Sequence, residues 1–416
     1  MKTVYMPYMC DHVYAIEAAF KALGQNAQVL TPSDDESLEI GMDFTIGKEC
    51  SPCFMTTGDI VRLTQQPSFD PAQSVILMPT TAGPCRFGQY ASLQRDILDQ
   101  AGLEQVEIIS PSAANAYQGL GKNSMKLRQL IWQGTVATDL LQKLLYEYRP
   151  YETNKGQTDE LYQQGLAHIK EGVQAGGGKP LIKAMQWIAK QFEQLPVDRS
   201  EPRPIIGIVG EIYIRLNSYG NQDIIRKVET MGGEVRIASM MEWLYYTNWT
   251  VKNNAQHSHL FLSFISISIV DFYQQHQEHK LLKTVEHLLR HPHETPVAKL
   301  MDNIRPFYEP ALDTEAVLSM GKAVDFAHLG LNGILNLMPF SCMPGIITAG
   351  MAPRIRADLG NIPWLDVIFD AQGGTHFNTR LEAFMYQATQ YQRSTEKRSG
   401  VENRKSVIPE PVALTT

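Results

Sequence analysis

The stretch TVYMPYMCDHVYAIEAAFKALGQNAQVLTP, residues 3–32, indicates the fold class of this chain. An apolar run covers residues 3–9, a helical pattern follows through residues 15–24, and a second apolar run begins at residue 27. Gly24 stands where the helix is expected to end, because glycine is common just past a helix C-terminus. A strand, a helix and a strand in this order predict a βαβ unit, the start of a parallel sheet.

Further strand and helix patterns repeat this alternation along the chain. The segments that resemble strands are SVILMPT (74–80), VEIISP (106–111), PIIGIVGEIYI (204–214), EVRIAS (234–239), GILNLMP (333–339) and WLDVIFD (364–370). Helical patterns separate them, among them residues 90–102, 223–233 and 380–392. Short strands that alternate with helices of about a dozen residues are typical of doubly wound parallel sheets. We therefore expect an α/β protein with two such lobes.

The length of 416 residues is too great for one small core. Between about residues 120 and 195 strand patterns are missing, and helical periodicity dominates. The predicted organisation is a first α/β lobe at 1–118, a helical insert and linker at 119–200, a second α/β lobe at 201–392 and a polar, flexible tail at 393–416.

Charge and hydrophobicity argue against two classes of partner. The chain has 37 basic and 44 acidic residues, for a net charge of -7, which gives no electrostatic reason to expect nucleic acid. No apolar run reaches the roughly 20 residues of a membrane helix, since HLFLSFISISIV at 259–270 is too short and too rich in serine. The N-terminus resembles a buried strand rather than a signal peptide, so we expect a cytoplasmic protein.

Five cysteines are the residues most indicative of function: Cys10, Cys50, Cys53, Cys85 and Cys342. An odd number in a large chain argues against a disulfide framework and leaves reduced thiols, metal ligands or a nucleophile. Cys10, Cys85 and Cys342 follow predicted strands, and the loops at the carboxyl ends of parallel strands form ligand crevices. Cysteines from distant parts of the sequence are therefore expected to converge there.

Cys85 is the strongest single candidate. It lies in the sequence GPCR (83–86) ahead of a predicted helix, where the helix dipole and the arginine should favour the thiolate. Thiolates bind soft metals, and cysteines with few histidines nearby favour an iron–sulfur cluster or zinc. Cys50 and Cys53 form a Cys-x-x-Cys sequence before another helix, in which Cys53 either completes a metal site or packs in the core. Cys10 is interpreted as structural.

Five blocks of sequence resemble a known family. They are GKECSPCFMTTGDIV (47–61), MPTTAGPCRFGQYASLQRDIL (78–98), GIVGEIYIRLNSYGN (207–221), LMPFSCMPG (337–345) and IPWLDVIFDAQGGTHFNTRLEAF (362–384). In this order they resemble the iron–sulfur proteins of the 2-hydroxyacyl-CoA dehydratase superfamily, above all its dehydratase-like and activase-related members. The similarity extends over about residues 1–392.

The resemblance implies two flavodoxin-like lobes and a 4Fe–4S cluster held by cysteines from both. Its matched ligands are Cys50, Cys85 and Cys342, with Arg86 beside the cluster. Three protein thiolates leave one iron open for metal-assisted chemistry. The implied function is the dehydration or reduction of a small acyl-CoA-type substrate by a homo- or heterodimer that receives low-potential electrons from an ATP-dependent activator protein.

Three alternatives stay open. If Cys53 closes the fourth iron, the protein becomes an electron carrier or a cluster-bearing scaffold without a substrate of its own. A double-cubane-type reductase would need more cysteine ligands than the three that match. A structural zinc site is the third alternative. ATP hydrolysis is expected from a partner, because QAGGGKP (174–180) lacks the spacing of a phosphate-binding loop and follows a helix.

Other polar residues are weaker candidates. One set leaves a predicted strand and either lines the crevice or covers the outer face of the strand: Glu211, Tyr213, Arg215 and Asn217. A second set lies around a predicted helix start, where an anion or an acid–base histidine would fit: Asp370, Gly373, Gly374, Thr375, His376 and Arg380. His276 and His279 have a metal-binding spacing, but their polar neighbours indicate a solvated helix.

Overall fold

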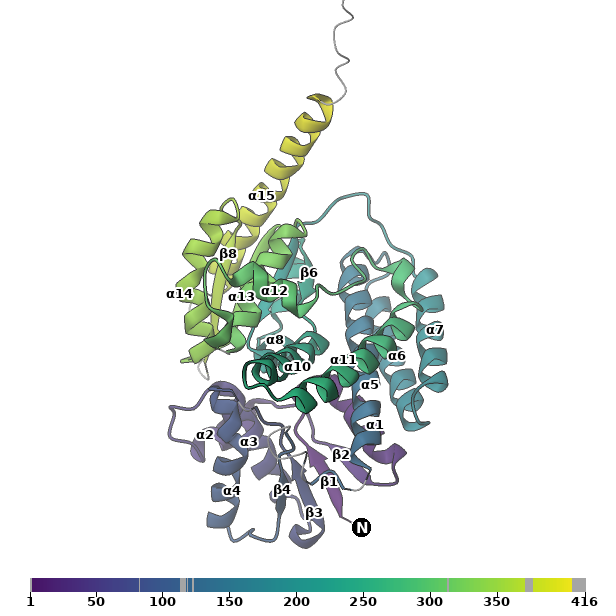
Figure 1. Cartoon of the computed structure of the whole chain (residues 1–416), viewed down its shortest axis with the longest axis vertical. Coiled ribbons are helices and arrows are strands. Elements are labelled where there is room, and N and C mark those ends of the chain that lie inside the picture. Colours follow the sequence, from purple (N-terminus) through teal and green to yellow (C-terminus); the bar gives the residue numbers. More distant parts are fainter. Residues whose placement is uncertain are drawn as a thin grey trace, which may run out of the picture.

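The computed structural model describes residues 2–81, 83–112, 117, 119–121, 123–312, 314–370 and 377–405, with only the helical backbone for 398–405. Two four-stranded parallel sheets organise it (Figure 1). The strands are β1 (Thr3–Met6), β2 (Asn26–Val29), β3 (Ser74–Leu77), β4 (Glu107–Ile109), β5 (Ile205–Gly210), β6 (Glu234–Ile237), β7 (Gly333–Pro339) and β8 (Trp364–Phe369). Their orders are β2-β1-β3-β4 and β6-β5-β7-β8, so each lobe has the flavodoxin-like order 2-1-3-4. The predicted fold class is confirmed.

Helices cover the faces of both sheets. In the first lobe they are α1 (His12–Ala22), α2 (Asp35–Asp43), α3 (Ser51–Thr64), the 3₁₀ helices η1 (Pro71–Gln73) and η2 (Arg86–Gln89), and α4 (Tyr90–Gln100). The central strands β3 and β7 are buried along their whole length, which explains their continuous apolar sequences. The close packing of α2 on α3 requires glycine, because a Cβ atom at Gly58 would lie 1.7 Å from the backbone oxygen of Ser37.

Three long helices lie between the two sheets in the sequence. These are α5 (Ser124–Tyr148), α6 (Gln157–Gln174) and α7 (Lys179–Glu193), with the short η3 (Arg149–Tyr151) after α5. They match the helical periodicity of this region, and QAGGGKP forms the turn between α6 and α7 as expected. Figure 1 shows them side by side along one flank of the molecule, where they share a core with α1 that includes Phe20, Leu140 and Ile188.

The second lobe contains the remaining helices. They are α8 (Ile212–Leu216), α9 (Ile224–Thr230), α10 (Met240–His257), α11 (Phe261–Leu282), η4 (Glu286–Leu288), α12 (Val297–Ile304), η5 (Pro310–Leu312), α13 (Glu315–His328), α14 (Met343–Asp358) and α15 (Phe377–Lys405). The expected irregular tail from residue 393 is helical as far as Lys405, because α15 continues past the body of the lobe (Figure 1). Residues 406–416 lie outside the described part.

The strand expected at 204–214 ends early. Gly210 has a φ of +118°, and a Cβ atom there would lie 2.0 Å from the backbone oxygen of Leu337. The chain then turns into α8, whose N-cap is Glu211. Its carboxylate accepts hydrogen bonds from the backbone N–H groups of Tyr213 and Ile214, at 3.1 and 2.8 Å. A capped helix therefore replaces the second half of the predicted strand.

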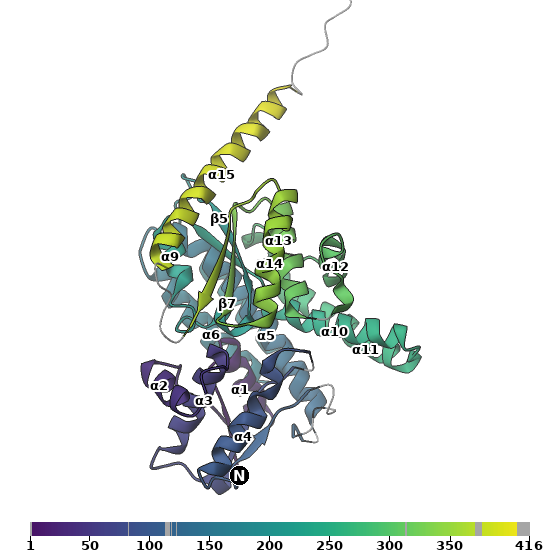
Figure 2. The same cartoon turned by 90° about the vertical axis from the view of Figure 1, so that its left-hand side faces the viewer.

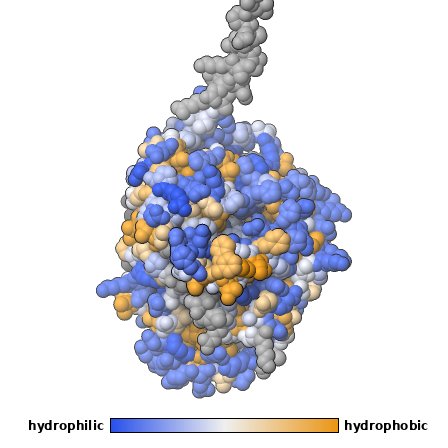
Figure 3. All heavy atoms as spheres, viewed as in Figure 1, coloured by the Kyte–Doolittle hydropathy of each residue, from blue (hydrophilic) through white to orange (hydrophobic). Residues whose placement is uncertain are grey.

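Helix α11 exposes an apolar face that Figure 3 shows as a group of hydrophobic side chains on the surface. Its most exposed apolar residues are Phe261, Leu262, Ile265, Ile269 and Phe272. This helix contains most of the segment at 259–270. In the described ranges, no helix combines the length and the hydrophobicity that a membrane span requires.

The two sheets face each other with their carboxyl ends. Figure 2 shows the second lobe above the first, and the strands of the second lobe run toward the first lobe. The side chain of Asn217, just after α8, donates to the backbone oxygens of Tyr8 and Met9, just after β1, at 3.4 and 3.3 Å. Met55 of α3 packs into the core of the second lobe. The junction of the lobes therefore lies where ligand crevices form in such sheets.

Candidate functional site

The three matched cysteines each occupy the N-cap of a helix. Cys50 precedes α3, Cys85 precedes η2 and Cys342 precedes α14. The Cys342 sulfur accepts a hydrogen bond from the backbone N–H of Gly345, at 3.4 Å. Cys85 and Cys342 also follow the third strand of their lobes, β3 and β7. They therefore stand at equivalent positions, next to the point where the strand order of each sheet reverses.

Arg86 joins the loops that carry these cysteines. Its Nη1 donates to the backbone oxygen of Lys48, 2.7 Å away, and its Nη2 donates to the backbone oxygen and hydroxyl of Ser341, at 2.6 and 3.1 Å. Lys48 lies two residues before Cys50, and Ser341 directly precedes Cys342. One guanidinium therefore fixes three cysteine-bearing loops from two lobes against one another.

Desolvation governs the charge state of the four thiols at this junction. It raises the pKa of Cys53 and of Cys85 to about 12, and it also raises the pKa of Cys50 and of Cys342. Nearby carboxylates and thiols raise these pKa values further, with Cys50 acting on Cys53 and Cys85, and Cys85 acting on Cys342. The expectation that the helix start makes Cys85 a thiolate is therefore wrong, because desolvation outweighs it.

The sulfur donors at this junction suit a cluster better than a single metal ion. In the part of the chain that the structure describes, no three His, Cys, Asp or Glu side chains are arranged to hold a metal ion. The four thiols nevertheless act on one another electrostatically, and Cys50 and Cys53 share a small core with Met78 and Tyr90. The Tyr90 hydroxyl lies 2.5 Å from the Cys50 sulfur. Soft donors without histidine suit an iron–sulfur cluster, which spreads its ligands wider than a single ion does.

Two carboxylates border the thiols. Glu211 is near enough to raise the pKa of Cys50, and burial raises its own pKa. At the start of α13, burial and the charge of Glu211 raise the pKa of Glu315 to about 7, although Arg215 and a hydrogen bond with Trp243 act in the opposite direction. Glu315 is therefore a group that gains or loses a proton near neutral pH. Sequence reasoning missed it, because a glutamate in the first turn of a helix is commonplace.

The four candidates after β5 separate into two pairs. Glu211 borders the thiols, and Arg215 is buried behind it at 3 % exposure, with Nη1 donating to the Gly210 backbone oxygen at 3.4 Å. Tyr213 and Asn217 instead hold the lobes together. The Tyr213 hydroxyl lies 3.2 Å from the Met55 sulfur. The interpretation of these residues as crevice-lining therefore suits Glu211 alone, because Arg215 is buried and the second pair has a structural role.

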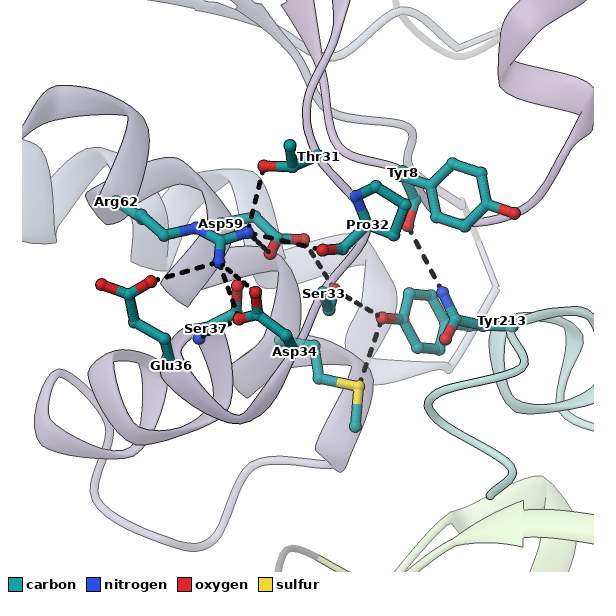
Figure 4. Close-up of polar contacts among 12 residues, drawn as sticks. Tyr8, Thr31, Pro32, Ser33, Asp34, Glu36, Ser37, Asp59, Arg62 and Tyr213 are labelled. Carbon is teal, nitrogen blue, oxygen red and sulfur yellow. Dashed lines mark hydrogen bonds and ion pairs between the residues drawn. The ribbon is translucent and has the colours of Figure 1, made fainter. Parts of the chain in front are cut away.

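A buried polar network lies next to the contact between Tyr213 and Met55 (Figure 4). The Ser33 hydroxyl donates to Asp59 at 2.8 Å and lies 3.3 Å from the Tyr213 hydroxyl. Arg62 faces the same loop, but its Nη1 binds both carboxylate oxygens of Asp34, each at 2.7 Å. Burial raises the pKa of Asp59 to about 6. The loop after β2, helix α3 and the second lobe therefore meet at an acid that titrates close to neutral pH.

A pocket of about 340 Å³ is lined by Glu49 and Ser51, which flank Cys50 in the sequence, and by Phe340, two residues before Cys342. Its lining residues come from both lobes: Met42, Thr45, Gly47, Glu49, Ser51, Phe54, Phe340, Phe369 and Asp370. Four of these side chains are large and apolar, and two are acidic. Such a pocket suits a small, mainly apolar group held next to the cysteine loops.

The remaining candidates contribute less to this site. Gly373, Gly374, Thr375 and His376 lie outside the described residues. Arg380 is exposed and donates to the backbone oxygen of Asp366 at 2.8 Å. His276 and His279 are exposed on α11, in agreement with a solvated helix.

Comparison with known proteins adds no assignment to this geometry. No model of a known family matches the chain, and no curated protein matches it significantly.

Proposed function

We propose that the chain is a cytoplasmic iron–sulfur protein of the 2-hydroxyacyl-CoA dehydratase type. Cys50, Cys85 and Cys342 would hold a 4Fe–4S cluster, and an ATP-dependent activator protein would supply low-potential electrons. The reaction would be the dehydration or reduction of a small acyl-CoA-type substrate. The observation that carries the proposal is the bridge made by Arg86, because it gathers the three matched cysteine loops at the junction of the lobes.

When bound, the cluster would supply an electron and an open iron that acts as a Lewis acid. The residues of this chain would supply a hydrogen bond to a ligand thiolate and a proton for the reaction. Tyr90 is placed to donate a hydrogen bond to the Cys50 sulfur, at 2.5 Å, which favours the charged form of a ligand thiolate. Loss of a hydroxyl as water needs a proton, and Glu315, with its pKa raised to about 7, is partly protonated at neutral pH and would supply one.

The pocket beside the cysteines supports an acyl group as its occupant. Its volume of about 340 Å³ lies at the small end of ligand pockets, which range over about 300 to 1,000 Å³. The apolar side chains of Phe54, Phe340 and Phe369 would surround the acyl chain. Glu49 and Asp370 make the lining unsuited to phosphates, so the nucleotide part of coenzyme A would lie outside.

The test is the metal content of protein purified without oxygen. About four irons and four sulfides per chain, the content of one 4Fe–4S cluster, are expected. Cys50→Ser, Cys85→Ser and Cys342→Ser should each lower iron content, whereas Cys10→Ser, which replaces a buried cysteine outside the proposed ligand set, should keep it. A colourless protein without iron after anaerobic reconstitution, or one that holds zinc instead, would contradict the proposal.

A second candidate, an electron carrier without a substrate, rests on the position of Cys53. This residue is 1 % exposed in the first turn of α3, and its N–H donates to the backbone oxygen of Cys50 at 2.8 Å. A fourth thiolate there would leave no open iron. Cys53→Ser decides between the two functions: unchanged iron content favours the enzyme, and loss of iron comparable to that of Cys50→Ser favours the carrier. Iron well above four atoms per chain would favour the double-cubane alternative.

A further inference from the structure

The cysteine outside the proposed ligand set has a base and a carboxylate aligned behind it. The Cys10 sulfur lies 3.4 Å from Nδ1 of His12, and Nε2 of the same ring lies 3.0 Å from Oδ1 of Asp139. All three are buried, at 5 %, 2 % and 2 % exposure. Two of them come from the loop after β1 and the start of α1, and the third comes from α5, more than a hundred residues away.

Asp139 is held as an acceptor, and this fixes the roles of the other two groups. Its Oδ1 also accepts from the backbone N–H of Met240 at 3.0 Å, and its Oδ2 accepts from that of Met241 at 2.8 Å. These amides belong to the start of α10, where a carboxylate is stabilised by the helix dipole. Because a carboxylate only accepts hydrogen bonds, Nε2 of His12 carries the proton of that contact. Nδ1 therefore faces the sulfur of Cys10 and can take its proton.

The charge of His12 agrees with this geometry. Burial on its own lowers the pKa of the imidazole, but the charges of Cys10 and Asp139 overcome it and raise the pKa to about 10. The charged and titratable groups that face the trio come from several elements. Tyr8, before α1, interacts with Cys10, whereas Arg215 on α8 and Glu278 on α11 interact with Asp139. Behind Tyr8, the carboxylate of Asp11 accepts hydrogen bonds from the hydroxyls of Tyr8 and Tyr162, and it also acts on Tyr14.

We propose that Cys10 is an activated thiol, with His12 as its base and Asp139 as the positioning residue, and that it reacts with small hydroperoxides. The sulfur attacks one peroxide oxygen, an S–O bond forms and the O–O bond breaks. The sulfur binds the terminal oxygen, and the imidazolium of His12 gives its proton to the departing hydroxide of hydrogen peroxide or the alkoxide of an organic hydroperoxide, which leaves as water or as an alcohol. Sulfur is oxidised by two electrons to the sulfenic acid, and the peroxide is reduced. The 5 % exposure of Cys10 restricts the reaction to reagents of this size.

The arrangement is that of an activated cysteine nucleophile, in which a base lies next to the thiol and a third group orients the base. It lies apart from the proposed cluster ligands, so the inference does not depend on the proposed function. A role of the trio in stability alone would require no base in contact with the sulfur, since Asp139 already joins α5 to α10 through the two backbone N–H groups.

The test treats the protein with hydrogen peroxide in the presence of an iron chelator, traps sulfenic acid with a cyclic diketone, and follows the Cys10 peptide by mass spectrometry. In the wild type the rate at Cys10 should change less than about threefold between pH 6.5 and 8, whereas an unassisted thiol gains more than tenfold as it ionises. Iodoacetamide should label Cys10 much faster than a maleimide attached to a large dye.

His12→Asn should slow the reaction at Cys10 by at least about tenfold at pH 7 and by less than about threefold at pH 10, where an ordinary thiol ionises without a base. Cys10→Ala identifies the peptide signal. Equal slowing at both pH values would assign His12 a structural role and overturn the proposal. If His12→Asn does not fold, the wild-type pH profile decides, since a steep rise between pH 6.5 and 8 refutes an activated thiol.

Discussion

Replacement of Asp59 by Asn would show how a buried acid at the lobe junction limits stability. Asp59 is 2 % exposed and accepts a hydrogen bond from the Ser33 hydroxyl at 2.8 Å (Figure 4). Among the described residues its Oδ1 has no hydrogen-bond partner, and Nη2 of Arg62 lies 3.8 Å from it. Desolvation therefore dominates, and the pKa rises from 3.8 to about 6.

The direction of the effect follows from this rise. The folded chain holds the Asp59 proton more tightly than the unfolded chain, so stability falls as the pH increases from about 4 to about 6. The difference between 3.8 and about 6 corresponds to about 3 kcal/mol, at about 1.4 kcal/mol for each pKa unit. Asn does not ionise and avoids this loss. Asp59→Asn should therefore raise the free energy of unfolding by about 1 to 3 kcal/mol at pH 8 and change it little at pH 4.

Urea unfolding of both proteins at pH 4, 6 and 8, followed by tryptophan fluorescence and circular dichroism, measures this difference. Asp34→Asn is the matched control, because the hydrogen bond from Arg62 lowers the pKa of Asp34. The contribution of Asp34 is present above its unfolded pKa and is lost as the pH falls, so this variant should destabilise at pH 8. An Asp59→Asn protein that is destabilised at pH 8, or that differs from wild type by the same amount at pH 4 and pH 8, would refute the reasoning.

Two further substitutions test the packing that builds the junction. Arg86→Lys keeps the positive charge, but an ammonium group does not span both carbonyl partners of the guanidinium. We therefore expect the lysine variant to retain iron as poorly as Arg86→Ala does. Iron retention at the wild-type level in Arg86→Lys would show that the charge alone suffices. Gly58→Ala brings a Cβ atom to 1.7 Å from the Ser37 oxygen and should lower the melting temperature by more than about 10 °C in calorimetry. Gly350→Ala, where a Cβ atom meets no atom of the described residues within 4 Å, should leave it almost unchanged.

Local sequence patterns were sufficient to predict most of the fold. The apolar runs of β3 and β7 are fully buried strands, and the helical periodicity between about residues 120 and 195 became α5 to α7. The prediction failed where a single backbone feature decides the structure. At Gly210 the positive φ ends a strand whose apolar pattern continues to Ile214. A hydrophobic pattern does not indicate such a turn, because the turn depends on the close approach of the neighbouring strand in the folded sheet.

The site was only partly predictable, because its electrostatics arise from contacts that are distant in sequence. The positions of Cys50, Cys85 and Cys342 at helix starts follow from local patterns. The high pKa of Cys85 does not, since it reflects desolvation and carboxylates contributed by the other lobe. The same holds for Glu315, whose raised pKa depends on its placement near Glu211. Charge states thus required the assembled junction, whereas residue identities and spacing required only the sequence.

The shared strand order explains why the loops that carry Cys10, Cys85, Glu211 and Cys342 lie at this junction. In a 2-1-3-4 sheet the strand order reverses between the first and third strands, so the loops after those two strands face the opposite lobe. Both third strands lead to a cysteine, Cys85 or Cys342, and one arginine spans the short distance between their loops. The first strands are followed by residues of different types, β1 by Cys10 and β5 by Glu211. Burial lowers the pKa of Arg215, and the negative charges of Glu211 and Asp139 act in the opposite direction. This buried cation therefore lies between the activated thiol and the proposed cluster site, and its replacement by Met should alter both reactions.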